Sequence, residues 1–222
     1  MDNNILIQQL KKYLPKNMSI PKEIEMLYDF IEENGLYTDI NGVRYGFLFP
    51  EKELKESRTK EGRDGGTIIT FCPDDPDNFK YWFGMESDEI RERLCVFAQS
   101  GGDGSECALW LDDNNETKIV HFGSGSGSML TCILADNAVD FLRLLAIGYD
   151  EICWNEDYPY PPNERPCNDY FVKPNLIYRE WVEKTFNVTI PKTALEIVKH
   201  PVDMDSDSTD DEFLNWVNKF LE

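Results

Sequence analysis

The chain has 222 residues, 41% of them hydrophobic and 13% aromatic, which is enough to bury a core in one large domain or two small ones. Its formal net charge of −20 excludes electrostatic binding to nucleic acid or to an anionic membrane. The same charge suits a basic protein partner, although it is also ordinary for an acidic cytosolic protein.

The lack of targeting signals and the spacing of the cysteines indicate the compartment. No stretch approaches 18 apolar residues, and the N-terminus lacks the cationic start of a secretory signal. Six cysteines occur without a CxxC pair, so we expect neither a disulfide framework nor a zinc site. These features predict a cytoplasmic protein in a reducing environment.

The N-terminal third reads as two helices and a hairpin. Apolar residues at helical spacing predict a helix over Ile5–Leu14. A second helix is expected to open at Ile20-Pro21 and to end at Asn34-Gly35, because proline fits a first helical turn and glycine ends a helix. Asn41-Gly42 predicts the turn of a hairpin, with a strand over Val43–Phe49.

The next segment alternates between polar and apolar stretches. Glu51–Gly66 is highly charged and is expected to form a short helix and a loop. Thr67–Cys72 is β-branched, and Phe79–Phe83 is aromatic, so both are predicted as strands. Glu86–Arg93 is expected to be a charged connector or a single helical turn.

The stretch Leu94–Glu151 predicts the core. Four short apolar runs separated by glycine, asparagine and aspartate are typical of a β-meander. A capped amphipathic helix over Ala138–Ile147, with Gly148 as its stop, is expected to close this sheet. The four runs are Leu94–Ala98, Cys107–Leu111, Lys118–Phe122 and Met129–Leu134.

The C-terminal part is less regular. Cys153–Tyr170 is rich in proline, aromatic residues and acids, and is expected to be a loop on the core or a contact surface. Asn175–Phe186 predicts a further helix. Thr209–Glu212 reads as a capping box for a last helix whose apolar residues include Phe213 and Trp216.

Motifs that carry chemistry are weak. Gly123–Gly127 resembles a phosphate loop, but a strand-like run follows it where a phosphate loop needs a helix, so a hairpin loop is favoured. Asp203, Asp205 and Asp207 begin like a calcium loop that lacks its later ligands. A catalytic pair of His121 with Cys95, Cys107 or Cys132 is formally possible. The sequence alone does not show that the two side chains lie close enough to react together.

Several strings together resemble the SUKH superfamily (Smi/Knr type). The match runs from about Ile20 to Glu151, and the order and spacing of the strings carry it more than any single one. The strings are Ile20-Pro21-Lys22-Glu23-Ile24 with Asn34-Gly35, then Phe97-Ala98 with Gly101-Gly102-Asp103-Gly104, then Leu109-Trp110-Leu111-Asp112, Val120-x-Phe122-Gly123-Ser124, and Asp140-Phe141-Leu142 with Gly148-Tyr149.

The resemblance implies an α+β domain with a mixed, mostly antiparallel sheet flanked by helices. We expect one domain over residues 1–222, with a recognisable core at about 20–151 and a C-terminal loop and helical extension at 152–222. The resemblance also implies an immunity protein that neutralises a cognate polymorphic toxin, often a nuclease, by direct binding and without catalysis or a cofactor. The alternatives are an intracellular scaffold or regulatory interaction protein and, from another class, a small hydrolase or ligand-binding enzyme using the glycine loops.

Exposed acids and aromatic residues are the expected contacts with a basic partner, because tyrosine and tryptophan dominate interface energies and acids would meet cationic groups. For Trp154 and Tyr158, packing of the loop onto the core is the competing interpretation. The predicted contact residues are Asp103, Asp112, Asp113, Glu151, Trp154, Glu156, Asp157, Tyr158 and Tyr160.

Overall fold

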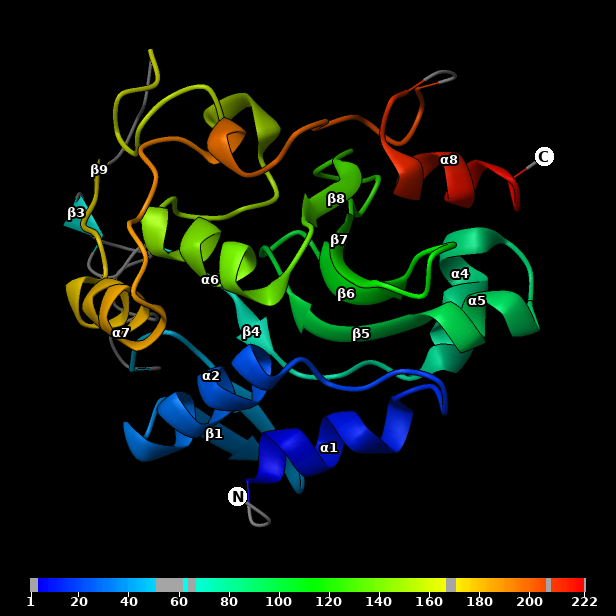
Figure 1. Ribbon diagram of the computed structural model, residues 1–222, viewed down its shortest axis with the longest axis horizontal. Coiled ribbons are helices and arrows are strands. Elements are labelled where there is room, and N and C mark those ends of the chain that lie inside the picture. Colours follow the sequence, from blue (N-terminus) through cyan, green and yellow to red (C-terminus); the bar gives the residue numbers. More distant parts are fainter. Residues whose placement is uncertain (1–3, 51–61, 64–66, 167–170, 207–208, 222) are drawn as a thin grey trace.

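An antiparallel sheet forms the centre of the molecule. The computed structural model describes residues 4–50, 62–63, 67–166, 171–206 and 209–221. Seven strands follow the order β1-β2-β4-β5-β6-β7-β8, and every neighbouring pair is antiparallel. The parallel pairing in the described residues joins β3 (Gly62–Arg63) to β9 (Phe171–Val172) in a separate small sheet. Helices cover the large sheet on both faces (Figure 1), so the predicted α+β class is confirmed.

The four apolar runs of the central stretch form the last four strands of the sheet. They are β5 (Leu94–Gln99), β6 (Glu106–Leu111), β7 (Thr117–Phe122) and β8 (Thr131–Ala135). Each pairs with the next along the chain, so the predicted meander is confirmed. The glycine and aspartate clusters become the connections between strands.

A tight hairpin begins the sheet, as Asn41-Gly42 predicts. It joins β1 (Tyr37–Ile40) to β2 (Val43–Gly46), and both turn residues have positive φ, 52° and 81°. Asparagine and glycine tolerate this conformation, and its twist matches that of the strands. The next strand, β4, is shorter than expected and covers only Thr70–Phe71.

Three helices cover the first face of the sheet. They are α1 (Ile5–Tyr13), α2 (Lys22–Glu33) and α6 (Ala138–Ile147), all close to the predicted positions. Their apolar faces pack on inward side chains of the strands, such as Phe97 and Leu109, in a large buried cluster. The Asn137 side chain caps α6 by accepting from the Asp140 N–H at 2.9 Å.

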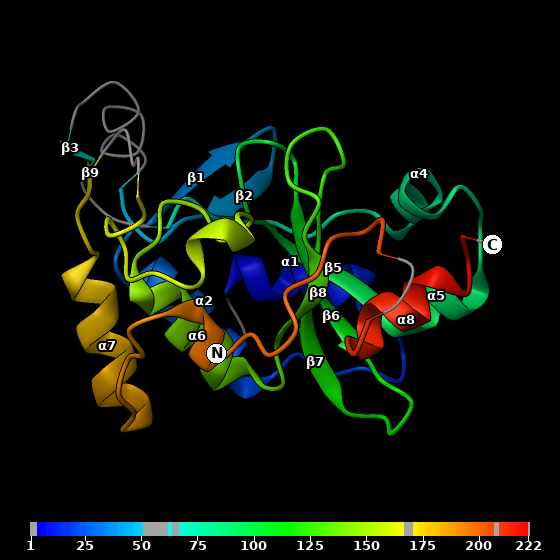
Figure 2. The ribbon, with the colours of Figure 1, turned by 90° about the horizontal axis from the view of Figure 1, so that it is seen from above.

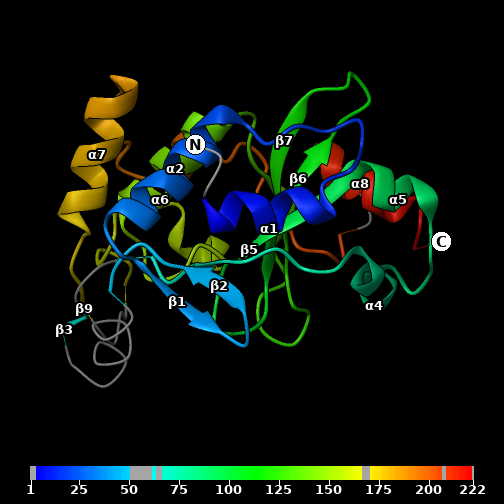
Figure 3. The same ribbon diagram turned by 90° about the horizontal axis from the view of Figure 1, so that it is seen from below.

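Helix α7 (Leu176–Phe186), also predicted, packs outside this layer. Figure 3 shows it beside α6 and α2, where the ring centroids of Trp181 and Phe30 lie 4.6 Å apart. The C-terminal extension therefore packs on the core through this helix.

Three shorter helices cover the second face. They are α4 (Phe79–Phe83), α5 (Asp88–Arg93) and α8 (Glu212–Asn218), with α5 in place of the expected connector or helical turn. Figure 2 shows them together on the opposite side of the sheet from α2 and α6. Phe213 lies at their centre, with its ring centroid 4.9 Å from that of Phe122 and 5.3 Å from that of Trp110. This second cluster is rich in aromatic residues.

Two predictions about this face are wrong. Phe79–Phe83 is a helix and not a strand, because Asp75 caps a 3-10 turn over Pro76–Asn78 that leads into it. The two phenylalanines, four residues apart, then face the same cluster. The cap of the last helix is Asp211, which accepts from the Leu214 N–H at 2.9 Å, and not Thr209.

The segment before α8 covers the β8 edge of the sheet. The Thr131 N–H donates to the Val202 carbonyl at 2.9 Å, and the Met204 N–H donates to the Met129 carbonyl at 2.8 Å. Further along, the Asp211 carboxylate accepts from the Ile133 N–H at 2.9 Å. An edge strand with satisfied donors is a poor template for aggregation.

The remaining chain contains two more 3-10 turns, Asn155–Asp157 and Ala194–Glu196. The predicted helix and loop over Glu51–Gly66 lie almost wholly outside the described residues. In the described part of the chain, every helix is too short or too polar to cross a bilayer.

The packing of Phe213 generates a stability prediction. Phe213→Ala should lower the free energy of unfolding by about 3–5 kcal/mol, because it removes the ring between β6, β7 and α8. Urea unfolding would measure this. Leu221→Ala, at a position that is 52% exposed, is the control and should change stability by less than about 0.5 kcal/mol. Equal effects of the two substitutions would contradict this packing.

Candidate functional site

Three loops converge at one end of the sheet. They are the β5–β6 loop (100–105), the β7–β8 loop (123–130) and the segment after α6 (150–160). In a meander, alternate connections fall at the same end, which brings the first two loops together (Figure 2). Helix α6 runs back toward this end and delivers the third.

The carboxylate of Asp103 joins two of these loops. It accepts hydrogen bonds from the Ser105 N–H at 3.0 Å and from the Ser105 hydroxyl at 2.8 Å. From the β7–β8 loop it accepts the Ser124 hydroxyl and the Ser128 N–H, each at 2.7 Å. Burial alone would raise the pKa of Asp103, but these donors outweigh burial and lower the pKa below its ordinary value. The carboxylate is therefore ionised at neutral pH.

The third loop is bonded to the other two. The Glu151 carboxylate accepts the Gly102 N–H at 2.7 Å and the Trp154 indole N–H at 2.8 Å. The Ser128 hydroxyl donates to the Cys153 carbonyl at 2.5 Å. Three segments far apart in the sequence thus form one bonded unit.

The glycine-rich β7–β8 loop is tightly packed, and several of its N–H groups are bonded within the protein. A Cβ on Gly123 would lie 2.6 Å from the Ser128 carbonyl oxygen, and one on Gly127 would lie 2.7 Å from an Asp103 oxygen. The N–H groups of Ser124, Gly125 and Gly127 all donate within these loops. A phosphate cradle needs such groups free. The negative Asp103 also lies among them, so the geometry supports the hairpin-loop interpretation.

The outer side of these loops is acidic. The Asn155 side chain donates to Asp203 at 3.3 Å, which places residues 203–205 beside the third loop. Asp157 forms an ion pair with Arg165 at 3.0 Å, whereas exposed Glu156 and Asp205 have no ion-pair partner among the described residues. We call the three loops and residues 203–205 together the acidic loop surface.

Seven of the nine predicted contact residues lie in these loops, but one of the seven is not accessible. Tyr158 is fully buried, and its hydroxyl donates to the Ile152 carbonyl at 2.5 Å. The prediction that its side chain is exposed is wrong, because the ring packs the loop onto the core. Trp154 is half-buried, Glu156 is exposed and Tyr160 is 37% exposed. Their contact with a partner stays a prediction.

The other two predicted residues lie at the opposite end of the sheet, in the β6–β7 turn. Asp112 is only 4% exposed and accepts the N–H groups of Asn114 and Glu116, each at 2.8 Å. Its predicted exposure is also wrong, because the carboxylate organises the turn. Asp113 is exposed and pairs with Arg93 at 2.8 Å. Neither residue belongs to the acidic loop surface.

His121 is a buried structural residue. Its Nδ1 lies 2.7 Å from the Leu130 carbonyl oxygen, which can only accept, so Nδ1 carries the proton. Nε2 then accepts from the Ser100 hydroxyl at 2.7 Å. Burial lowers the pKa of His121 to about 4.

The possible Cys–His pair is not activated. Cys107 and Cys132 are the cross-strand neighbours of His121. Burial raises the pKa of both thiols, and it raises the pKa of Cys95 to about 12. A nucleophilic pair needs a thiolate beside an imidazolium, whereas here both partners are neutral.

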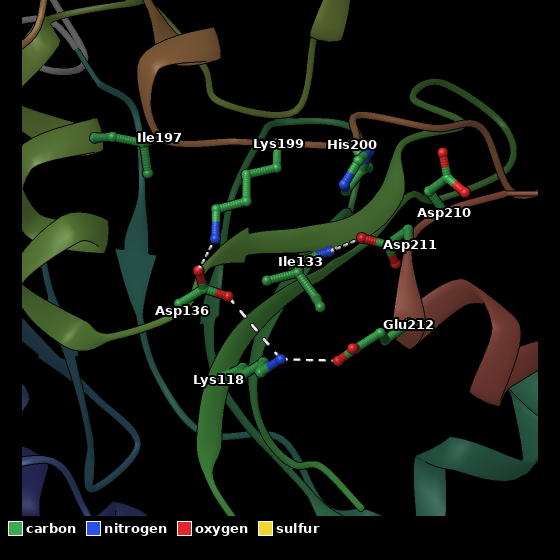
Figure 4. A pocket seen from close by; sticks show the side chains of 9 residues that line it. All are labelled: Lys118, Ile133, Asp136, Ile197, Lys199, His200, Asp210, Asp211 and Glu212. Carbon is green, nitrogen blue, oxygen red and sulfur yellow. Dashed lines mark hydrogen bonds and ion pairs between the residues drawn. The ribbon is translucent and has the colours of Figure 1, made fainter.

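A cavity of about 220 Å³ between β8 and α8 holds a network of ion pairs (Figure 4). Lys118 lies 2.8 Å from Glu212, 4.0 Å from Asp136 and 3.5 Å from Asp112. Asp136 also pairs with Lys199. These charges satisfy one another, and the network ties the last helix to the sheet. In the described part of the chain no three His, Cys, Asp or Glu side chains are grouped to hold a metal ion.

The sequence interpretation missed the serines of this site. Ser105, Ser124 and Ser128 follow glycines in loops that read as simple turns. One sequence feature could have predicted these contacts: an aspartate in one glycine-rich loop and serines at alternating positions in the other. Comparison with protein-family models, with curated proteins and with solved structures finds no match for this chain.

The Asp103 network predicts a stability effect that depends on pH. Asp103→Asn should lower the free energy of unfolding at pH 7 by about 1–3 kcal/mol, because charge-assisted hydrogen bonds are lost. The folded-state pKa is lowered, so the stabilisation is present above the unfolded value near 3.8 and is lost as the pH falls through the folded value.

Urea unfolding of wild type and variant at several pH values would measure this difference. Asp205→Asn removes an exposed carboxylate and is the matched control, with an expected change below about 0.5 kcal/mol. A difference for Asp103→Asn that stays constant down to the lowest pH would argue against an ionised carboxylate.

His121 predicts a second pH effect. Its pKa falls from 6.5 in the unfolded chain to about 4 in the fold, so the unfolded state binds the proton more readily. The free energy of unfolding should decline by about 3 kcal/mol as the pH falls from 6.5 to about 4. His121→Gln should remove this part of the decline. An unchanged profile in His121→Gln would contradict the assignment.

Proposed function

We propose that this chain is an immunity protein, which binds a basic toxin directly and blocks it. The observation that carries the proposal is the acidic loop surface, where three loops joined by hydrogen bonds, together with residues 203–205, expose the carboxylates of Glu156 and Asp205 beside the partly exposed rings of Trp154 and Tyr160. This is the composition of a surface that meets cationic groups through charge and anchors itself through aromatic residues.

The charge of the chain supports a basic partner. Acids outnumber lysine and arginine by 42 to 22. A net charge of this size steers a cationic partner toward the protein and raises the association rate at low salt. A nuclease fits this description, because its active cleft must attract phosphates. On this proposal the protein acts in the cytoplasm, where such a toxin would meet nucleic acid.

The polar groups of the site support binding over catalysis. The serine hydroxyls at Asp103 are occupied by internal hydrogen bonds, and the buried imidazole is neutral. A loop surface whose serine hydroxyls at Asp103 are already bonded within the protein suits recognition. The resemblance to the SUKH superfamily adds the toxin to this proposal, since its bacterial members neutralise toxins by binding. A scaffold or regulatory protein would share the surface and differ in its partner.

Coexpression tests the proposal. If a neighbouring gene encodes a toxin, cells that express it should survive only when this chain is also made. Inactive toxin is the control for expression burden. If the cells die at equal rates with and without the chain, the immunity proposal is wrong.

Reversal of charge at the third loop tests the surface. Glu156→Lys with Asp157→Lys should slow association with the toxin about tenfold at low ionic strength, with a smaller effect at about 0.15 M where charges are screened. Stopped-flow mixing would measure the rate.

The opposite end of the sheet offers a matched control. Asp113→Lys with Glu116→Lys makes the same change of charge at exposed positions of the β6–β7 turn. This variant should associate nearly as fast as wild type. Equal slowing by both double variants would mean that only total charge matters and would remove the acidic loop surface from the interface.

A further inference from the structure

We propose that Glu151 is the positioning residue of the acidic loop surface: it sets how Trp154 and the Gly101–Gly104 loop lie relative to each other and does not contact the partner. This inference rests on the proposed function, because it concerns the surface that binds the toxin. It differs from the sequence-based expectation, which placed Glu151 among the contacts.

The geometry of the carboxylate carries the inference. One oxygen of Glu151 accepts the Gly102 N–H at 2.7 Å, and the other accepts the Trp154 indole N–H at 2.8 Å. The two donors come from segments about fifty residues apart. Both oxygens are thus occupied by donors of the chain itself, and charge-assisted bonds of this length are strong. The side chain is half-buried between the segments that it joins.

The two segments are each held by other contacts as well. The Gly101–Gly104 loop is fixed by Asp103, and the third loop is fixed by the buried Tyr158 and by the bond from Ser128 to Cys153. The loops also touch, since a Cβ on Gly101 would lie 2.6 Å from the Cys153 sulfur. Loss of Glu151 should therefore change the arrangement of the loops without unfolding them.

A glutamine separates positioning from charge. The two donors face different oxygens of Glu151, and a glutamine has an oxygen at only one of these places and a donating NH₂ group at the other, so in the same position Glu151→Gln leaves one donor facing another donor. Glu156→Gln removes the same charge from an exposed carboxylate of the same loop and is the matched control.

Hydrogen exchange measured by NMR tests the positioning role without a partner. In Glu151→Gln, the Gly102 amide or the Trp154 indole N–H should exchange about tenfold faster or more, because a charge-assisted bond is lost. Glu156→Gln should leave both rates at their wild-type values. Unchanged exchange at both groups in Glu151→Gln would overturn the proposal.

Binding kinetics with the toxin as the probe test the consequence. Glu151→Gln should raise the dissociation rate about tenfold, because the residue acts through the loop geometry. Its association rate should fall no further than that of Glu156→Gln, which removes the same charge from the same loop. Glu156→Gln should lower the association rate and its salt dependence.

The outcomes distinguish the two proposals. A dissociation rate that Glu151→Gln leaves unchanged, or raises no more than Glu156→Gln does, would overturn the positioning role. A wild-type chain that does not bind the toxin would overturn the proposed function, while the exchange rates would still decide whether Glu151 positions the loops.

Discussion

The surface of this protein that we assign to binding depends on one internal anion, the carboxylate of Asp103. The β5–β6 and β7–β8 loops are rich in glycine, and glycine-rich chains lose much entropy when they are ordered. Four donors from the two loops converge on this carboxylate and offset that cost. Because the charge is supplied from within, the loops fold closed and the amides of Ser124, Gly125, Gly127 and Ser128 are bonded inside the molecule.

Packing on both faces of the sheet holds this end of the molecule in place. The first face buries a large aliphatic core beneath α1, α2 and α6, while the second buries an aromatic cluster beneath α4, α5 and α8. The C-terminal segment closes the β8 edge and brings residues 203–205 to the acidic loop surface. The last part of the chain therefore contributes both to stability and to the candidate site.

Local sequence signals predicted the elements well and the contacts poorly. Asn41-Gly42, the four apolar runs and the caps of α2 and α6 specify structure within a few residues, and all were found where expected. Phe79–Phe83 was wrongly predicted as a strand because aromatic residues favour strands. The capped turn before it starts a helix instead. Burial of Tyr158, and the bonds from Ser124 and Ser128 to Asp103, depend on contacts between distant segments that spacing alone does not encode. Asp112 is buried within its own turn, where it accepts the N–H groups of Asn114 and Glu116.

An ionised Asp103 ties the loops of the surface together. The most direct measurement is an NMR titration of its side-chain carboxyl carbon in the folded protein, with the amide of Ser128 followed in the same spectra. We expect a pKa below the ordinary value of 3.8, and a Ser128 amide shift that follows the same curve. A pKa at or above 3.8, or a Ser128 amide that does not respond, would contradict this role of Asp103.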